Sequence, residues 1–176
     1  MNNRDNLSSA DNQQERLQLI PRDIGNYLSG FADGEGSFNI SIIKRQHDYR
    51  NGWKVAASFN ISQRDPTIPL LFNKIFQCGT IRYRKDGICY YEVRNVHDLN
   101  ETVRFFFKQF PLLSDRQSQR LRLLLQAVDL LAKKEHLKPL GLKRVLYIRE
   151  KMLSNRPRTY SIADVLKNPQ RLHAKH

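Results

Sequence analysis

Cysteine is scarce in this chain of 176 residues, and two cysteines exclude a scaffold held by several disulfides. Neither Cys78 nor Cys89 lies in a CxxC pair, and the five histidines show no spacing typical of zinc ligands. The chain also lacks a run of roughly 18–20 apolar residues and the apolar core of a signal peptide. We therefore expect an intracellular protein with neither structural zinc nor a membrane partner.

Acidic residues are also few. The chain has 17 Asp and Glu against 30 Lys and Arg, a formal net charge of +13 and a pI near 10.0. Residues 1–33 are slightly acidic, whereas residues 97–176 carry most of the positive surplus. A surplus of this size favours a polyanionic partner, and nucleic acid is the leading candidate. A basic surface that only aids solubility is the alternative.

The apolar residues, 40% of the chain, change their period along the sequence and indicate one domain with a substantial core. Helical spacing precedes the glycines near residue 34, alternating strands and a short helix follow, and helical spacing then persists to the end. The expected elements are helix 21–33, strands 37–43 and 53–62, helix 68–76, strands 79–84 and 88–94, and helices 97–110, 114–134, 140–153 and 161–166.

These elements predict a mixed α/β fold of the α+β type, with one four-stranded antiparallel sheet made of two hairpins. If Arg82 pairs with Tyr90 across the second hairpin, Cys89 lies opposite Tyr83, and Cys78 is then too distant for a disulfide. We expect a flexible polar arm at 1–20, a core at 21–137 and a basic helical extension at 138–176. That extension either contacts flanking nucleic acid or caps the core.

One face of the predicted sheet is unusually rich in side chains that bond to bases and phosphates. An ordinary solvated face is the alternative. The candidate DNA-binding residues on this face and in its adjoining turn are Asn39, Ser41, Arg45, Lys54, Ser58, Asn60, Arg82, Arg84, Tyr90, Glu92 and Arg94.

The segment LSGFADGEG, residues 28–36, resembles the LAGLIDADG motif of homing endonucleases and related maturases. Leu28, Gly30, Asp33 and Gly36 are identical to that motif, and Glu35 replaces its last acidic residue. The similarity covers about residues 22–135 and is strongest to the single-motif, homodimeric branch. It implies the αββαββα fold of the family, here with additional C-terminal helices.

The resemblance implies that the motif helix packs against its counterpart in a second copy of the chain. Small residues allow close approach of two helix backbones, and one motif per chain implies a homodimer that reads a roughly palindromic site. Asp33 is assigned to packing and capping. The expected interface residues are Leu28, Ser29, Gly30, Ala32 and Asp33.

The resemblance also assigns the chemistry. Glu35 corresponds to the acid that binds Mg²⁺, for which Mn²⁺ is expected to substitute, and the Gly34 carbonyl is expected to assist. Gln63 matches the polar residue that orders water, and Arg116 matches a basic residue that stabilises transition-state charge. A second basic residue of the family has no clear counterpart, although Arg64 is the nearest candidate.

The leading hypothesis is therefore a Mg²⁺-dependent endonuclease that makes double-strand cuts in a long, pseudo-palindromic DNA site and is encoded by an intron or an intein. An RNA maturase that binds its own intron is one alternative, and a DNA-binding regulator that does not cut is another. The residues leave open whether the protein acts in an organelle or in a prokaryotic cytoplasm.

Overall fold

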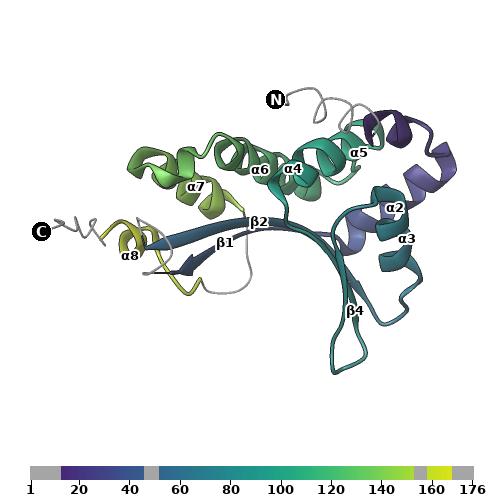
Figure 1. Cartoon of the computed structure of the whole chain (residues 1–176), viewed down its shortest axis with the longest axis horizontal. Coiled ribbons are helices and arrows are strands. Elements are labelled where there is room, and N and C mark those ends of the chain that lie inside the picture. Colours follow the sequence, from purple (N-terminus) through teal and green to yellow (C-terminus); the bar gives the residue numbers. More distant parts are fainter. Residues whose placement is uncertain (1–12, 46–51, 153–157, 168–176) are drawn as a thin grey trace, which may run out of the picture.

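The computed structural model describes residues 13–45, 52–152 and 158–167, and it has the predicted mixed α/β architecture (Figure 1). Four antiparallel strands form one sheet in the order β1-β2-β4-β3. The strands are β1 (Ser37–Lys44), β2 (Trp53–Gln63), β3 (Thr80–Tyr83) and β4 (Cys89–Val93). The main helices are α2 (Arg22–Glu35), α3 (Thr67–Phe76), α4 (Val96–Asp98), α5 (Arg104–Gln109), α6 (Asp115–Ala132), α7 (Pro139–Lys151) and α8 (Ile162–Leu166).

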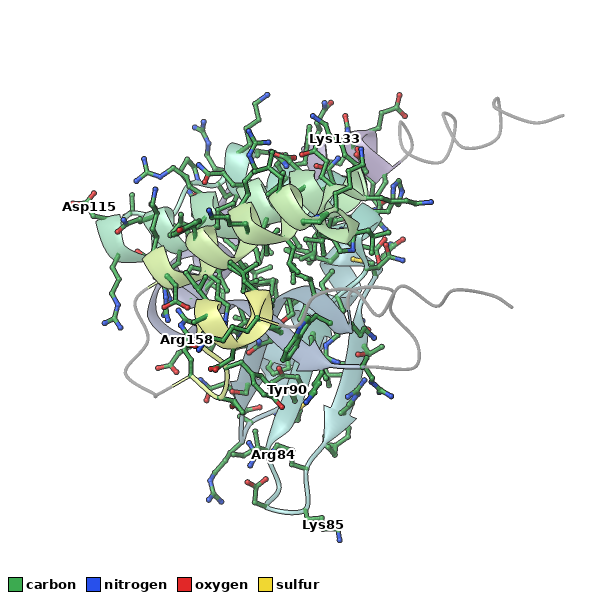
Figure 2. The ribbon with its side chains drawn as sticks, turned by 90° about the vertical axis from the view of Figure 1, so that its left-hand side faces the viewer. Arg84, Lys85, Tyr90, Asp115, Lys133 and Arg158 are labelled. Atoms are coloured by element: carbon green, nitrogen blue, oxygen red, sulfur yellow. The ribbon has the colours of Figure 1, made fainter. Side chains whose placement is uncertain are left out.

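The second hairpin has the register that the sequence predicts. Arg82 pairs with Tyr90, and Tyr83 pairs with Cys89. Both cysteines are free thiols, as expected. Figure 2 shows the tip of this hairpin, with Arg84 and Lys85, projecting at the opposite side of the molecule from Lys133 in the helical layer.

The helices cover one face of the sheet, because the alternation in β2 places its apolar side chains on that side. Trp53, Phe59 and Ile61 are buried there. Helix α6 lies over β1 and β2, whereas α3 packs against β2, β3 and β4. Phenylalanine rings fill the space between sheet and helices, for example Phe76 and Phe106, whose ring centroids are 4.9 Å apart.

Two predicted helices differ in detail from the structure. The run at 97–110 is helical throughout, but a π-helical turn, η1 (Leu99–Val103), separates α4 from α5. Helix α2 continues past Gly34 and ends at Glu35, because the Gly36 N–H donates to the Ala32 carbonyl and closes another turn. Both acids of the motif therefore lie within the last turn of the helix.

The polar segment before Pro21 is not an arm over its whole length. Residues 13–18 form a helix whose Leu17 is fully buried. The Arg16 guanidinium donates to the Phe76 carbonyl at 3.0 Å, and the Gln13 amide donates to the Thr102 hydroxyl at 2.6 Å. These contacts attach residues 13–18 to the core, and the rest of the predicted arm, 1–12, lies outside the described residues.

The C-terminal extension shares the core instead of forming a separate unit. Val145 and Leu146 of α7 and Val165 of α8 are buried in the same apolar cluster as the strands. The 3₁₀ turn η2 (Glu135–Leu137) connects α6 to α7. The described helices of this extension therefore cap the core, and contact with flanking nucleic acid stays a prediction.

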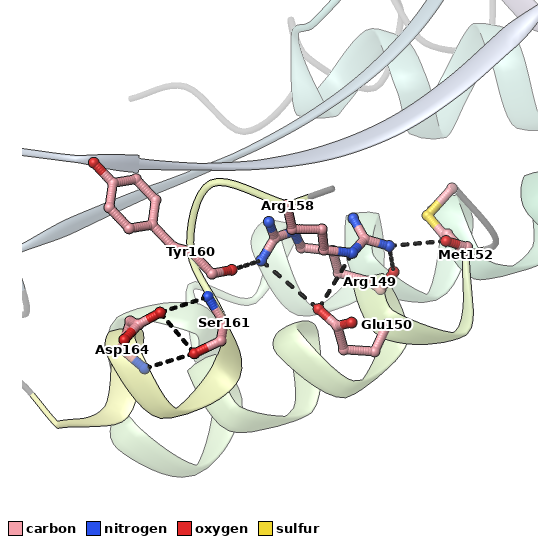
Figure 3. A network of polar contacts seen from close by, with 7 residues as sticks. All are labelled: Arg149, Glu150, Met152, Arg158, Tyr160, Ser161 and Asp164. Carbon is pink, nitrogen blue, oxygen red and sulfur yellow. Dashed lines mark hydrogen bonds and ion pairs between the residues drawn. The ribbon is translucent and has the colours of Figure 1, made fainter. Parts of the chain in front are cut away.

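Polar contacts fasten α8 and the residues before it to α7 (Figure 3). Arg149 is only 6% exposed, and its guanidinium donates to the Tyr160 carbonyl at 3.1 Å. Arg158 donates to the Arg149 and Met152 carbonyls and pairs with Glu150 at 3.3 Å. A capping box between Ser161 and Asp164 begins α8. Tyr160 is thereby held against Trp53 of β2, with ring centroids 4.9 Å apart.

Within the described part of the chain, none of the helices is both long enough and apolar enough to cross a lipid bilayer.

Candidate functional site

The two acids of the motif point in different directions from the end of α2. Residues two positions apart on a helix are separated by roughly 200°, so one faces the protein when the other faces solvent. Asp33 faces the protein, where its carboxylate accepts from the backbone N–H groups of Leu113 (3.2 Å) and Ser114 (2.8 Å) and from the Ser114 hydroxyl (2.5 Å). Ser114 is the N-cap of α6, so Asp33 fixes the start of that helix.

Glu35 faces solvent. Among the described residues, none bonds to or forms an ion pair with its carboxylate. The neighbouring Gly34 is also exposed, and backbone carbonyls in the last turn of a helix have no partner within the helix. This end of α2 therefore presents oxygen atoms, the ligand type that Mg²⁺ and Ca²⁺ prefer.

Helix α6 approaches the motif with its first turn. The Gln117 side-chain amide donates to the Gly36 carbonyl at 2.8 Å, and Arg116, the preceding residue, is exposed. Gln63, the predicted water-ordering residue, is the last residue of β2 and is half-buried. Since Ser37 pairs with Asn60, β2 extends three residues beyond β1 at the end of the sheet where α2 enters.

The predicted helix interface needs correction. Leu28, Ser29 and Ala32 are buried against their own chain, and the Ser29 hydroxyl donates to the Phe110 carbonyl at 2.8 Å. Because these side chains already fill the protein interior, they are not available to a second helix. Of the five predicted interface residues, Gly30 alone is exposed, while Asp33 is half-buried and its carboxylate is bonded to Ser114 at the start of α6.

A different face of α2 is open. Tyr27 is 54% exposed, and Gly30 and Gly34 lie on the same face of the helix. Apart from the helix's own backbone and the adjoining residues, no described atom lies within 4 Å of the position that a Cβ at either glycine would take. In a helix rich in small residues, periodicity does not reveal which face is buried. The sequence pattern therefore assigned the buried Leu28, Ser29 and Ala32 to the helix interface.

The predicted DNA-binding residues fall into three groups by exposure. Lys54 and Tyr90 are half-buried, and Ser58, Asn60 and Glu92 are buried. The remaining candidates are exposed: Asn39, Ser41, Arg45, Arg82, Arg84 and Arg94. The open face of the sheet therefore offers four arginines and two short polar side chains directly.

Glu92 is not accessible to a base, since it is only 2% exposed. Its carboxylate lies 2.8 Å from Arg94 Nε and accepts from the Tyr90 hydroxyl at 3.2 Å. Burial, together with the charge of Glu92, raises the pKa of Tyr90 to about 12, so this hydroxyl keeps its proton at neutral pH. Glu92 therefore orients its two neighbours, and its carboxylate is covered by protein atoms in this structure.

One residue of the site, Gln117, belongs to the family resemblance through the Arg116-Gln117 pair, but the sequence assigns it no role. Gln117 is buried and lies in the first turn of an amphipathic helix. Its partner is the backbone of a segment 81 residues away, which no local pattern reveals.

Residues 28–123 match the family described as LAGLIDADG endonuclease. The chain belongs to this family. Two curated relatives differ in how much of their own length this chain matches. An uncharacterized 50.9 kDa protein in ND4 intron 1 of Podospora anserina is 36% identical over 115 residues, which cover 63% of this chain and 25% of that protein. DNA endonuclease I-CvuI of Chlorella vulgaris is 33% identical over 104 residues, 58% of this chain and 62% of the other.

Solved structures of homing endonucleases share the fold. The archaeal intron-encoded homing endonuclease I-Vdi141I, complexed with DNA, superposes with a TM-score of 0.72 and 26% identity, covering 81% of this chain and 92% of that chain. The homing endonuclease I-LtrWI, bound to target DNA, gives a TM-score of 0.69 and 26% identity over 75% of this chain but only 46% of its own. This chain therefore corresponds to nearly all of one neighbour and to about half of the other.

Proposed function

We propose that this chain is a site-specific homing endonuclease, encoded by an intron or an intein, that makes double-strand cuts in a long pseudo-palindromic DNA target. The observation that carries the proposal is the exposed carboxylate of Glu35 at the end of the motif helix, while Asp33 is committed to α6. A regulator that only binds DNA has no need to keep an acid free at this position.

The residues at the end of α2 fit a divalent cation. Among the described residues, no three or more of His, Cys, Asp and Glu come together, so Glu35 and the Gly34 carbonyl would share the ion with water and DNA phosphate. Mg²⁺, or Mn²⁺ in its place, supplies activation of water and stabilisation of the departing oxygen in phosphodiester hydrolysis. Gln63 orients the attacking water, and the exposed guanidinium of Arg116 stabilises the charge that develops on the phosphate.

The active form in this proposal is a homodimer. The open face of α2, with Tyr27, Gly30 and Gly34, allows the backbones of two helices to approach closely. The match to nearly all of I-Vdi141I and to half of I-LtrWI also supports a chain that makes half of a nuclease. A monomer in sedimentation at micromolar concentration, with target DNA present, contradicts this part of the proposal.

The open face of the sheet is the proposed DNA-binding surface. Arg82, Arg84 and Arg94 are exposed on it or at its edge, and guanidinium groups pair with guanine in the major groove or with phosphates. The DNA complexes of the two structural neighbours support the same class of partner.

Binding of intron RNA is the second candidate, and one observation favours it. Exposed cations continue onto the helical layer, at Lys143 and Arg144 of α7 and at Lys133, which Figure 2 shows far from the β3–β4 hairpin. Lys143 also lies over the ring of the exposed Tyr147, 5.9 Å from its centroid. Protection of intron RNA that is lost in a Lys143→Ala/Arg144→Ala double variant supports this second activity.

Cleavage of a plasmid library in Mg²⁺ tests the main proposal. We expect the wild-type chain to cut at a defined sequence and Glu35→Gln to bind the same sequence without cutting, because the amide weakens a hard-cation site. Glu101→Gln, which changes a carboxylate in the helical layer, serves as the control and should cut normally. Specific binding with no cleavage by the wild type in Mg²⁺ or Mn²⁺ contradicts the nuclease.

A further inference from the structure

Gln117 is a buried amide that contacts the motif from outside it. Its side chain is 7% exposed, in the first turn of α6. The side-chain NH₂ donates to the Gly36 carbonyl at 2.8 Å, in a buried bond between residues 81 positions apart. Gly36 directly follows Glu35 and joins α2 to β1, so this bond holds the backbone next to the proposed metal ligand.

The same segment is held at its other end by the same helix. Asp33 accepts from Ser114, and the Ser114 hydroxyl accepts from the Gln117 N–H at 3.3 Å. Asp33, Ser114, Gln117 and Gly36 therefore form a closed circuit of bonds. Glu35 lies inside that circuit in sequence, yet none of the described residues bonds to its carboxylate. The position of Glu35 is thus set through its backbone.

Gly36 has little freedom to adapt on its own. Its N–H donates to the Ala32 carbonyl at 2.9 Å, and a Cβ at this residue would lie 2.4 Å from that carbonyl oxygen. Both backbone groups of Gly36 are therefore used, one by α2 and the other by Gln117. Without the Gln117 amide, the peptide after Gly36 loses the bond that fixes its orientation.

The Gln117 amide uses only one of its two ends. Its Oε1 is buried and accepts no hydrogen bond from any described residue, a situation that proteins usually avoid because it costs free energy. If Gln117 served only to fill space, an apolar side chain of similar volume would be more favourable at this position. The donor end explains why an amide occupies this position.

We propose that Gln117 is a positioning residue for the metal site. It fixes the Gly36 carbonyl, and so the orientation in which Gly34 and Glu35 present their oxygens to a divalent cation. The inference rests on the proposed nuclease activity and extends it to a residue outside the motif. Groups that hold metal ligands in place change metal affinity by roughly 10–100-fold when they are removed.

The test compares Gln117→Met, which keeps the volume and removes the donor, with Gln119→Met, an exposed neighbour on the same helix. Mn²⁺ binding to each protein–DNA complex is measured by electron paramagnetic resonance of the free ion. We expect Gln117→Met to weaken Mn²⁺ binding about tenfold or more, with DNA affinity in EDTA unchanged. Cleavage by Gln117→Met should recover partly at high Mn²⁺ concentration, and Gln119→Met should match the wild type.

Unchanged Mn²⁺ affinity in a folded Gln117→Met overturns the inference. If Gln117→Met does not fold, Gln117→Asn replaces it as the test. Its amide remains polar, but the side chain is one methylene too short to reach the Gly36 carbonyl. Its Mn²⁺ affinity should also be weakened, and a wild-type value overturns the inference. If the wild type cuts DNA and Gln117→Met requires the same Mn²⁺ concentration, the nuclease stands and only the positioning role of Gln117 is wrong. If the wild type never cuts, the proposed nuclease activity itself is wrong.

Discussion

The two hairpins of the sheet are similar in sequence pattern but differ in what holds them. Trp53, at the outer end of the β1–β2 hairpin, is 2% exposed and packs against Tyr160 of the C-terminal extension. The β3–β4 hairpin projects away from the body (Figure 1). Its Tyr83 is 65% exposed, and its turn is closed by the Arg84 N–H to the Ile88 carbonyl, with Gly87 at φ +80°.

The two hairpins therefore differ in how firmly they hold the side chains that face a ligand. Tertiary packing by a residue about a hundred positions away covers the β1–β2 hairpin at Trp53. Helix α3 packs against the base of the β3–β4 hairpin, whereas its tip is held by strand pairing and turn geometry. A surface with few buried contacts opens and adjusts more easily. We therefore expect β2 to be rigid at Trp53 and the tip of the β3–β4 hairpin to adapt to DNA.

The largest loss of stability is expected at Trp53. Trp53→Ala removes a buried ring and should lower the free energy of unfolding by about 3–5 kcal/mol. Tyr83→Ala, the matched change on the other hairpin, should alter it by no more than about 0.5 kcal/mol because the ring is exposed. Urea unfolding followed by circular dichroism measures both. Equal losses would show that the two hairpins are held alike.

A smaller loss is expected where the C-terminal segment is attached. Arg149→Met removes a buried guanidinium and leaves the Tyr160 carbonyl without its donor, which should cost about 1–3 kcal/mol of unfolding free energy. Arg144→Met is the control, since Arg144 is 63% exposed and lies 3.6 Å from Glu135, and it should change stability by less than about 0.5 kcal/mol. A stable Arg149→Met variant would mean that Tyr160 is held by ring packing alone.

Arg84, beside the turn of the β3–β4 hairpin, tests whether this hairpin reads DNA sequence. If it reads a guanine, Arg84→Ala should reduce discrimination at one position of each half-site by about 1–3 kcal/mol. Competition binding with single-base variants of the target measures this, and Lys108→Ala, which removes a charge from the helical layer, is the control. Uniform weakening on every sequence would make Arg84 a phosphate contact.

The smallest effect is expected from the ion pair at the tip of the same hairpin. Arg84 and Asp86 lie 3.0 Å apart, but both are largely exposed. Asp86→Asn keeps the oxygen that accepts from the Ile88 N–H, so its cost should stay below about 1 kcal/mol. Thermal unfolding at low and high salt measures it. A larger loss would show that this tip depends on its charges and not on its turn.

Local pattern was sufficient for the order of the elements and for the sheet. Alternation in β2 separates Trp53 and Phe59 from the polar face, and the turn at Gly87 sets the register that pairs Arg82 with Tyr90. The motif was also legible, because its spelling from Leu28 to Gly36 is specific. These features depend on neighbours in sequence, and a single chain displays them directly.

Local pattern was not sufficient to distinguish the buried face of α2 from its exposed face. It also did not distinguish exposed polar side chains of the sheet from buried ones that hold their neighbours in place. Ser29 and Gly30 are equally small, and only the packing of Phe110 and its neighbours shows which is buried. Glu92 follows the same alternation as Arg94, yet it is covered by the side chains around it. Burial of this kind depends on segments that are distant in sequence.

Motif spelling and periodicity alone predict the family, the fold and the pair of acids that end the motif helix. The tertiary structure decided how those acids divide their tasks, with Asp33 bound to the start of α6 and Glu35 left to solvent. It also decided that Gln117 reaches Gly36 and that the basic C-terminal extension caps the core. The physical reason is that periodicity and motif spelling act through neighbours in the chain, whereas burial and hydrogen bonding depend on which distant segments meet.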